Sequence, residues 1–472
     1  MDLYFERHDG DAATVEDFVK CFEDANGCDL TQFSLWYHQA GTPQITVSSS
    51  YDAIAKTLTL SLEQMVAATP GQTAKEPMHI PLKFTLIGEN GAEAQPTTVT
   101  GGKVTDDVLH LTERSQSFVF SGIGARPVVS LNRGFSAPVN LHFAQTKQDL
   151  AHIARHDSDL FARWQAITDL ALPNLTGAAR AAGTGAPVEC DATLCDALLA
   201  IAADDGLEPA FRAQALALPS ESDIARELGA NNDPDAIHQG RQAILSAIAK
   251  AGAATFRSLY DGMASSAPFS PDAAGAGRRA LRNAALGFLA LSENSPTGAA
   301  EAFAKADNMT DLSQALTVLA HRFPDATETH AALAAFESRF ASNALVLDKW
   351  FSIQATIPGE GALERVMRLM QNPHFTASNP NRVRALIGTF AFANPTGFNR
   401  RDGKAYHFFA EEILSIDTRN PQLAARLLTA LRSWRLLEPV RADQAREALM
   451  TIERATSLSS DVADIVERML KG

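Results

Sequence analysis

The sequence is short of cysteine and of positive charge. Among 472 residues there are four cysteines, and 41 Lys and Arg stand against 55 Asp and Glu, for a formal net charge of −14. Proteins that bind a nucleic-acid backbone need clustered Lys and Arg to replace counterions, so we expect no nucleic-acid partner. The low cysteine content favours a reducing, cytoplasmic setting. We expect small buried or half-buried thiols at Cys21, Cys28, Cys190 and Cys195.

Long apolar runs are missing as well. No stretch approaches the roughly 18 residues that cross a bilayer, so we expect no membrane association. Residues 1–7 also lack the basic segment and apolar stretch of a signal peptide. Apolar residues make up 46% of the chain, an ordinary globular balance. Because 472 residues exceed what one core accommodates, the length predicts two or three domains.

The motifs of metal and nucleophile chemistry are absent too. A helical zinc peptidase needs H-E-x-x-H, yet none of the twelve histidines is followed by Glu. His152 and His156 have the spacing, but Ile153 stands where the base belongs. Gly275-Ala276-Gly277 before Arg278-Arg279 is more typical of a solvated loop with a basic helix start than of an anion site. We therefore predict no catalytic residue and no metal ligand in this chain.

Three regions follow one another along the chain. The first forty residues are predicted to be helical, with a capping box at Thr14 and Asp17 and a second short helix that carries Leu30, Phe33, Trp36 and Tyr37. So many aromatic residues cannot be buried by two helices, which indicates the end of a larger domain and an exposed apolar patch formed by Phe18, Phe22, Phe33 and Trp36.

From about Gln44, apolar residues recur at every second position in short segments, and clusters of Gly, Pro and Asn separate these segments. About seven short strands of this kind predict an antiparallel β-sandwich of immunoglobulin-like architecture. After Phe143 the pattern is helical to the end, starting with one helix that carries Leu150 to Ile167, followed by a small-residue connector over 177–187. Asn-Pro pairs at 379, 394 and 420 predict helix starts. Successive amphipathic helices predict a large all-α superhelical domain of the armadillo or HEAT kind.

Arginines flank the apolar stripes of two late helices. Val383, Leu386, Ile387 and Phe390 form one stripe, beside Arg382 and Arg384. The other stripe, Ala424, Leu427, Leu428 and Leu431, is flanked by Arg426. The planar guanidinium suits a carboxylate partner at any working pH, although each arginine taken alone is more typical of a solvated helix face.

Taken together, many short segments resemble the bacterial alanyl aminopeptidases (the aminopeptidase N type, zinc metallopeptidases of the gluzincin type). They run in order along the whole chain and include Leu3-Tyr4-Phe5-Glu6-Arg7-His8-Asp9-Gly10, Pro77-Met78-His79-Ile80-Pro81, Phe135-Ser136-Ala137-Pro138-Val139, Asp307-Asn308-Met309-Thr310, Asp348-Lys349-Trp350-Phe351 and Ser378-Asn379-Pro380-Asn381-Arg382.

The resemblance implies the carboxy-terminal half of such an enzyme. Residues 1–41 would be the helical tail of the zinc catalytic domain, 42–145 the immunoglobulin-like sandwich and 146–472 the helical domain. The family's H-E-x-x-H would then lie upstream, so the resemblance places zinc in the parent enzyme and not here. The chain is expected to be inactive alone, with the missing catalytic half as its partner.

In that family the helical domain closes over the active-site chamber and helps to bind the peptide substrate. The resemblance assigns substrate binding to Arg384 and Arg426, which match the family's basic positions. An alternative is a stand-alone helical-repeat scaffold that binds peptides or proteins in its concave face. An enzyme of unrelated chemistry is a third interpretation, supported only by the weak motifs above.

Overall fold

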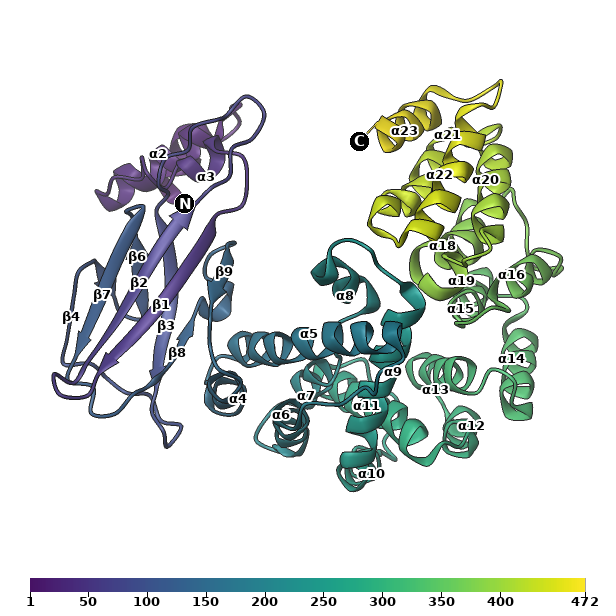
Figure 1. The fold of residues 1–472 in the computed structure, drawn as a ribbon, viewed down its shortest axis with the longest axis horizontal. Helices are drawn as coiled ribbons and strands as arrows, with labels where there is room; N and C mark the ends of the chain where they lie inside the picture. The colour runs from purple at the N-terminus through teal and green to yellow at the C-terminus, as the bar shows by residue number, and fades with distance from the viewer. Residues whose placement is uncertain (472) are drawn as a thin grey trace. The chain divides into compact units, whose positions relative to one another are not determined.

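The chain folds into two compact units, seen in a computed structural model that describes residues 1–471. One unit runs from Met1 to Leu170 and the other begins at Ala171. Figure 1 shows strands and a few helices in the first unit and helices throughout the second. Over the described residues, no helix combines the length and the apolar character that a membrane span requires.

Three short helices, α1 (Asp2–His8), α2 (Val15–Asn26) and α3 (Leu35–His38), open the first unit. The capping box at the start of α2 is confirmed, since Asp17 N donates to Thr14 Oγ1 and Thr14 N donates to the Asp17 carboxylate. The predicted second helix is shorter than expected, because Leu30 and Phe33 precede α3. The Glu23 carboxylate accepts from Leu30 N at 2.8 Å, and this contact takes the amide out of any helical ladder.

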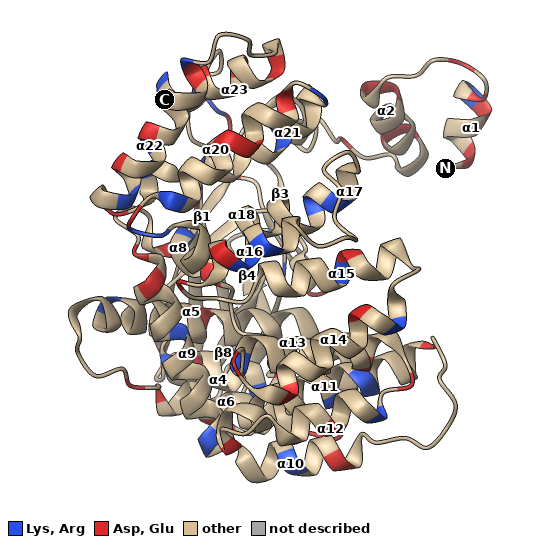
Figure 2. Cartoon of the chain, turned by 90° about the vertical axis from the view of Figure 1, so that its right-hand side faces the viewer, with Lys and Arg blue, Asp and Glu red and all other residues tan. Residues whose placement is uncertain are grey.

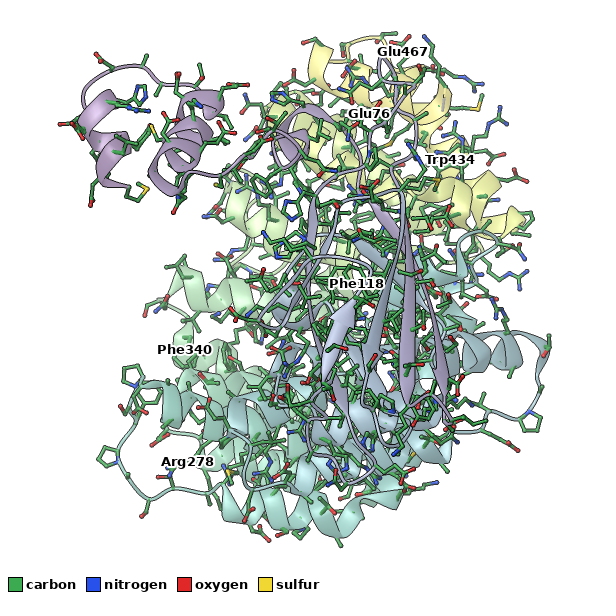
Figure 3. All side chains as sticks on the ribbon, turned by 90° about the vertical axis from the view of Figure 1, so that its left-hand side faces the viewer. Glu76, Phe118, Arg278, Phe340, Trp434 and Glu467 are labelled. Carbon is green, nitrogen blue, oxygen red and sulfur yellow. The ribbon has the colours of Figure 1, made fainter. Side chains whose placement is uncertain are left out.

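The aromatic residues of this segment are half-buried rather than exposed as predicted. Trp36 Nε1 donates to His79 O at 2.9 Å, which fastens α3 to the sandwich. Phe18 stands edge to face against Phe22, with 4.9 Å between ring centroids. Phe5 and Tyr37, by contrast, keep more than half of their surface exposed. In Figure 3, α1 and α2 (purple) project beyond the sandwich.

Nine strands form the sandwich: β1 (Gln44–Asp52), β2 (Thr57–Met65), β3 (Ile80–Ile87), β4 (Thr98–Thr100), β5 (Val104–Thr105), β6 (Val108–Leu111), β7 (Ser115–Ser121), β8 (Val128–Leu131) and β9 (Asn140–Phe143). One sheet has the order β4-β7-β2-β1-β9 and the other β5-β6-β3-β8. The strands pair antiparallel as predicted except at one edge, where β1 and β9 pair in parallel. Sequence periodicity missed β4 and β5, which at three and two residues are too short to show it.

Apolar side chains at every second position of the strands form the core of the sandwich. Leu58, Leu60 and Leu62 of β2 are all buried. Phe118 and Phe120 of β7 are fully buried, and Figure 3 labels Phe118 among the strands. Phe84 of β3 reaches Phe120 from the opposite sheet, with 5.3 Å between ring centroids. The inward positions are thus those that the period of two predicted.

Two helices follow the sandwich where one was predicted: α4 (Lys147–His156) and α5 (Leu160–Thr184). The break falls at Asp157, whose buried carboxylate accepts from Arg133 at 2.9 Å. The connector predicted over 177–187 is also wrong, since α5 continues to Thr184. Its alanines have the strongest helix propensity, and Ala178 and Ala179 are buried.

The second unit is a succession of helices in which sequence neighbours pack against each other. They are α6 (Ala192–Ala203), α7 (Pro209–Ala215), α8 (Glu221–Leu228), α9 (Pro234–Ala251), α10 (Ala253–Gly262), α11 (Ala273–Glu293), α12 (Thr297–Lys305), α13 (Met309–Arg322), α14 (Thr327–Phe340), α15 (Ala344–Ala355), α16 (Ala362–Met370), α17 (Pro380–Val383), α18 (Thr389–Ala393), α19 (Pro395–Phe398), α20 (Lys404–Asp417), α21 (Pro421–Leu428), α22 (Pro439–Glu453) and α23 (Ser460–Lys471).

The predicted Asn-Pro helix starts are confirmed. The side chains of Asn379, Asn394 and Asn420 each accept a backbone N–H of the following turn. Both predicted stripes are buried as well. Between α17 and α18 the chain adopts a π-helical stretch, η2 (Arg384–Gly388), that the sequence pattern did not predict. Both the backbone N–H and the Oγ1 hydroxyl of Thr389 donate to Arg384 O, five residues earlier.

A buried arginine joins distant parts of the helical unit. The Arg441 side chain, at the start of α22, is 0% exposed. Its Nη1 lies 3.1 Å from Asp233 Oδ1 and 3.0 Å from Glu438 Oε1, and its Nη2 contacts Asp235. Next to it, Asn232 N donates to Leu436 O and Glu438 N donates to Asn232 O. The start of α9 is thereby held to the start of α22 across more than 200 residues of sequence.

We predict that Arg441→Ala lowers the free energy of unfolding by about 3–5 kcal/mol, because it leaves neighbouring carboxylates without their cation. Urea denaturation followed by circular dichroism measures the change. Arg446→Ala, at an exposed position of α22, is the matched control and should shift stability by no more than about 0.5 kcal/mol. Equal stability of the two variants would contradict the structural role of Arg441.

Candidate functional site

The two histidines with metal-ligand spacing face the sandwich. His152 Nε2 lies 2.8 Å from Gly88 O, and the rings of His152 and His156 are 4.6 Å apart between centroids. Burial, and then the neighbouring His152, lower the pKa of His156. Within residues 1–471 no three or more His, Cys, Asp or Glu side chains come together as a metal site would need.

The glycine-rich segment before Arg278 is helical and not a loop, which corrects the expectation. Helix α11 begins at Ala273, and the Asp272 carboxylate accepts from Gly275 N at 2.7 Å. Arg279 stacks over the Phe269 ring at 4.6 Å. Because a carboxylate already caps this helix start, it offers little attraction to an external anion.

The structure separates the three arginines that sequence reasoning grouped together. Arg384 and Arg426 are exposed, on η2 and α21. Arg384 Nη1 donates to Asn381 Oδ1 at 3.1 Å, and neither guanidinium has a carboxylate within 4 Å among the described residues. Arg382 instead is buried, 3.3 Å from Asp348 and over the Phe351 ring. Basic residues on α17 and its neighbours are seen in Figure 2, where both signs of charge are interspersed.

The cysteines are free thiols with different surroundings. Cys21 is buried, whereas Cys28 is exposed, contrary to the expectation of buried or half-buried thiols. Cys190 and Cys195 are half-buried, with 2.8 Å between their sulfurs. Their spacing is not that of a C-x-x-C motif, and no sequence signal predicted that they would meet.

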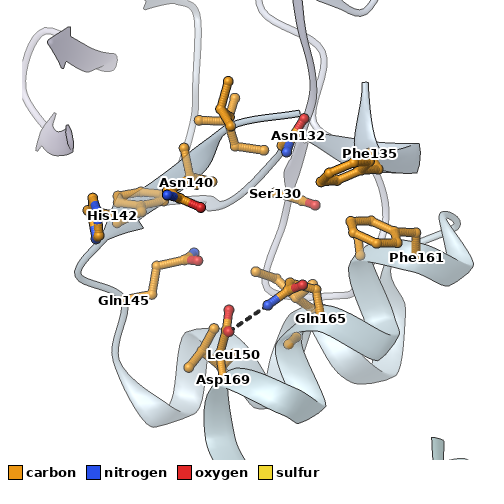
Figure 4. Close-up of a pocket in the computed structure, with 17 residues that line it drawn as sticks. Ser130, Asn132, Phe135, Asn140, His142, Gln145, Leu150, Phe161, Gln165 and Asp169 are labelled. Atoms are coloured by element: carbon orange, nitrogen blue, oxygen red, sulfur yellow. Dashed lines mark hydrogen bonds between the residues drawn. The ribbon is translucent and has the colours of Figure 1, made fainter. Parts of the chain in front are cut away.

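A first cavity, of about 400 Å³, lies within the first unit (Figure 4). The side chains of Asn132, Asn140 and Gln145 line it, and Gln165 donates to Asp169 Oδ1 at 2.7 Å. These neutral amides offer hydrogen bonds but no nucleophile. No sequence signal marks this cavity, because its walls come from β8, β9, α4 and α5, which only the fold brings together.

A second cavity, of about 720 Å³, lies within the helical unit, and most of the residues that line it have polar side chains. Its walls come from α8, α9, the end of α13 and the segment 392–396. Arg241 of α9 and Arg322 of α13 both line it. His321, also in its wall, lies with Nε2 3.0 Å from Thr356 Oγ1. No motif marks this site, since its residues are spread over more than 170 positions of the sequence.

Both parts of the chain match known protein families. Residues 147–471 match the family of unknown function DUF3458_C, described as ARM repeats, and residues 41–144 match DUF3458, described as an Ig-like fold. The chain belongs to the DUF3458_C family, whose match covers more than half of its length. The immunoglobulin-like sandwich followed by a helical-repeat domain, predicted from the sequence, is thereby confirmed.

Relatives of the chain are bacterial aminopeptidases. It is 36% identical to aminopeptidase N of Escherichia coli over 473 residues, 100% of this chain and 54% of that protein. Aminopeptidase N of Caulobacter vibrioides is 40% identical over 99% of this chain and 53% of its own length. Among solved structures, Legionella pneumophila aminopeptidase A in complex with aspartic acid superposes with a TM-score of 0.82 at 28% identity, over 99% of this chain and 53% of that one.

The chain therefore spans about half the length of the curated relatives it matches, and corresponds to their carboxy-terminal domains. The resemblance to the aminopeptidase N family, inferred from short segments of the sequence, is confirmed.

We predict that His321 makes the helical unit less stable in acid. Burial lowers the pKa of His321 to about 4, against about 6.5 for an unfolded histidine. Between these values the unfolded chain binds a proton that the folded chain does not, so stability falls as pH falls from about 6.5 to about 4, by up to about 3 kcal/mol. Urea titrations across this range should show a flatter profile for His321→Gln. Parallel profiles of the variant and the parent chain would refute the assignment.

Proposed function

We propose that this chain is the non-catalytic carboxy-terminal portion of a zinc-dependent alanyl aminopeptidase that removes amino-terminal residues from peptides. The observation that carries the proposal is the end-to-end match to about half of each aminopeptidase N. Residues 1–41 are assigned to the tail of the zinc catalytic domain, 42–145 to the sandwich and 146–472 to the helical domain. The projecting α1 and α2, with exposed Phe5, suit a segment that packs against further protein.

In this proposal the partner of the chain is the catalytic half, which supplies the zinc and the H-E-x-x-H motif, in the cytoplasm. The metal would polarise the peptide carbonyl and activate water there. The residues of this chain act on the substrate at a distance from that chemistry. The helical domain gates the active-site chamber, and Arg384 and Arg426 attract the free carboxylate of a short peptide. Their exposure and their lack of carboxylate partners support this role.

The purified chain should not hydrolyse alanine p-nitroanilide, and its zinc content should stay well below one atom per chain. Both measurements are made on one sample, before and after dialysis against zinc. Turnover that a chelator abolishes, and that survives repurification, would contradict the proposal and make His152 and His156 the first residues to replace. Tight peptide binding by the chain alone would favour the helical-repeat scaffold instead.

The arginines are tested in the chain joined to the amino-terminal half of the Caulobacter vibrioides relative. Arg384→Ala and Arg426→Ala should each lower kcat/KM about tenfold for an alanyl peptide with a free carboxylate, mainly through KM, because an opposite charge is lost. Hydrolysis of alanine p-nitroanilide, which has no carboxylate, should hardly change. Arg446→Ala is the charge-matched control. Equal losses on both substrates would point to a structural role and reject carboxylate binding.

A further inference from the structure

The polar cavity of the helical unit has two arginines in its wall and few groups to balance them. Arg241 Nε donates to Pro219 O at 2.9 Å and its Nη2 donates to Leu218 O at 3.4 Å. Arg322 Nη1 donates to the side-chain oxygen of Gln242. All three acceptors are neutral. In the described chain, no carboxylate comes within 4 Å of either guanidinium.

Several other half-buried or buried arginines of this chain have carboxylate partners, whereas Arg212 and Arg365 bind only backbone carbonyls among the described residues. Arg241 and Arg322 differ from these two in sharing the wall of one cavity. Arg133 lies 2.9 Å from Asp157, Arg400 binds Glu364 and Asp402, and Arg441 has three acidic neighbours. Desolvation of a cation costs free energy that such pairing offsets. Within residues 1–471, Arg241 and Arg322 have no carboxylate in contact, and burial lowers the pKa of both, although Glu221 acts on each in the opposite direction from a distance. Arg241 also lowers the pKa of Arg322, which places the two charges close enough to repel each other.

The acidic groups nearby are already engaged. Glu221 Oε1 lies 2.7 Å from His238 Nδ1, on the rim of the same cavity. Asp223 accepts from Ser220 and contacts Arg226. His321, the remaining titratable side chain of the wall, is neutral above its pKa of about 4. The cavity therefore carries positive charge that no neighbouring side chain neutralises by contact.

The guanidinium N–H groups that have no acceptor indicate the kind of ligand that this cavity could bind. A guanidinium has five N–H donors, so Arg241, which uses two, retains three, and Arg322, which uses one, retains four. Ser246 adds a hydroxyl to the wall, and Leu291 and Phe392 add apolar surface. A cavity of about 720 Å³ is in the range of small-molecule sites.

We propose that this cavity binds a small organic anion, through its carboxylate or phosphate groups, between the guanidiniums of Arg241 and Arg322. Guanidinium forks match both kinds of oxyanion by paired hydrogen bonds. The Ser246 hydroxyl adds a contact to the oxyanion, and the apolar residues contact the carbon skeleton. This site does not include Arg384 or Arg426, and it is independent of the proposed aminopeptidase role.

Isothermal titration calorimetry on the full chain tests the proposal, with citrate and inorganic phosphate as probes and chloride at matched ionic strength as the baseline. Citrate tighter than phosphate would assign a polycarboxylate, and the reverse order would assign a phosphate ester. Arg241→Gln and Arg322→Gln should each weaken binding of the preferred probe at least tenfold, since a charge-assisted pair of hydrogen bonds is lost. Arg446→Gln, which removes the same charge from an exposed site outside the cavity, should bind like the parent chain.

A second readout separates binding from folding. Removing one of two repelling, desolvated charges should leave the thermal midpoint of the Arg322→Gln variant unchanged or higher without anion, while the anion-induced rise of the midpoint disappears. Arg322→Lys, which keeps the charge, should retain part of that rise. No heat and no midpoint rise with either probe above the chloride baseline would overturn the proposal, as would equal binding by the Gln variants and the parent chain.

Discussion

The helical unit depends on how the charge of Arg441 is held. A solenoid of helix pairs needs only contacts between sequence neighbours, and its two ends are then free to move independently. Here a fully buried guanidinium draws Asp233 and Asp235 of the α9 start toward Glu438 at the start of α22. The backbone contacts of Asn232 with Leu436 and Glu438 run beside it. Helix α9, which forms part of the wall of the polar cavity, also packs against α19.

Burial and pairing with carboxylates distinguish the roles of the arginines in this chain. Where carboxylates surround the guanidinium, as at Arg441, the charge is satisfied within the fold and its role is structural. Where the guanidinium is exposed, as at Arg384 and Arg426, water satisfies it at little cost. Arg241 and Arg322 fit neither case, since they are largely desolvated and lack an acidic partner. Comparing burial with pairing thus separates residues that composition alone treats as equal.

Local signals in the sequence predicted local structure well. The capping box at Thr14 and the caps at Asn379, Asn394 and Asn420 were found because side chain and backbone lie within one turn. The alternation of β2 and β7 also sufficed to identify their inward faces. The predictions that were wrong concern features that depend on residues far away in the sequence. The break at Asp157 is set by Arg133, and the parallel pairing of β9 is set by β1 across nearly a hundred residues. The polar cavity was missed for the same reason.

The π-helical stretch of η2 has a consequence for how this segment tolerates change. A bond from residue i to i+5 encloses one more residue than an α-helical turn, so η2 behaves as a single-residue insertion held inside an otherwise continuous helix. Upstream of η2, the Asn379 cap fixes how α17 is rotated about its axis. Downstream, the buried Phe390 does the same for α18. Deleting one residue within η2 would merge the two helices without disturbing either anchor's own turn, but it would rotate Arg384 relative to the buried stripe. The direction in which this arginine points is thus encoded by the length of the segment as well as by its sequence.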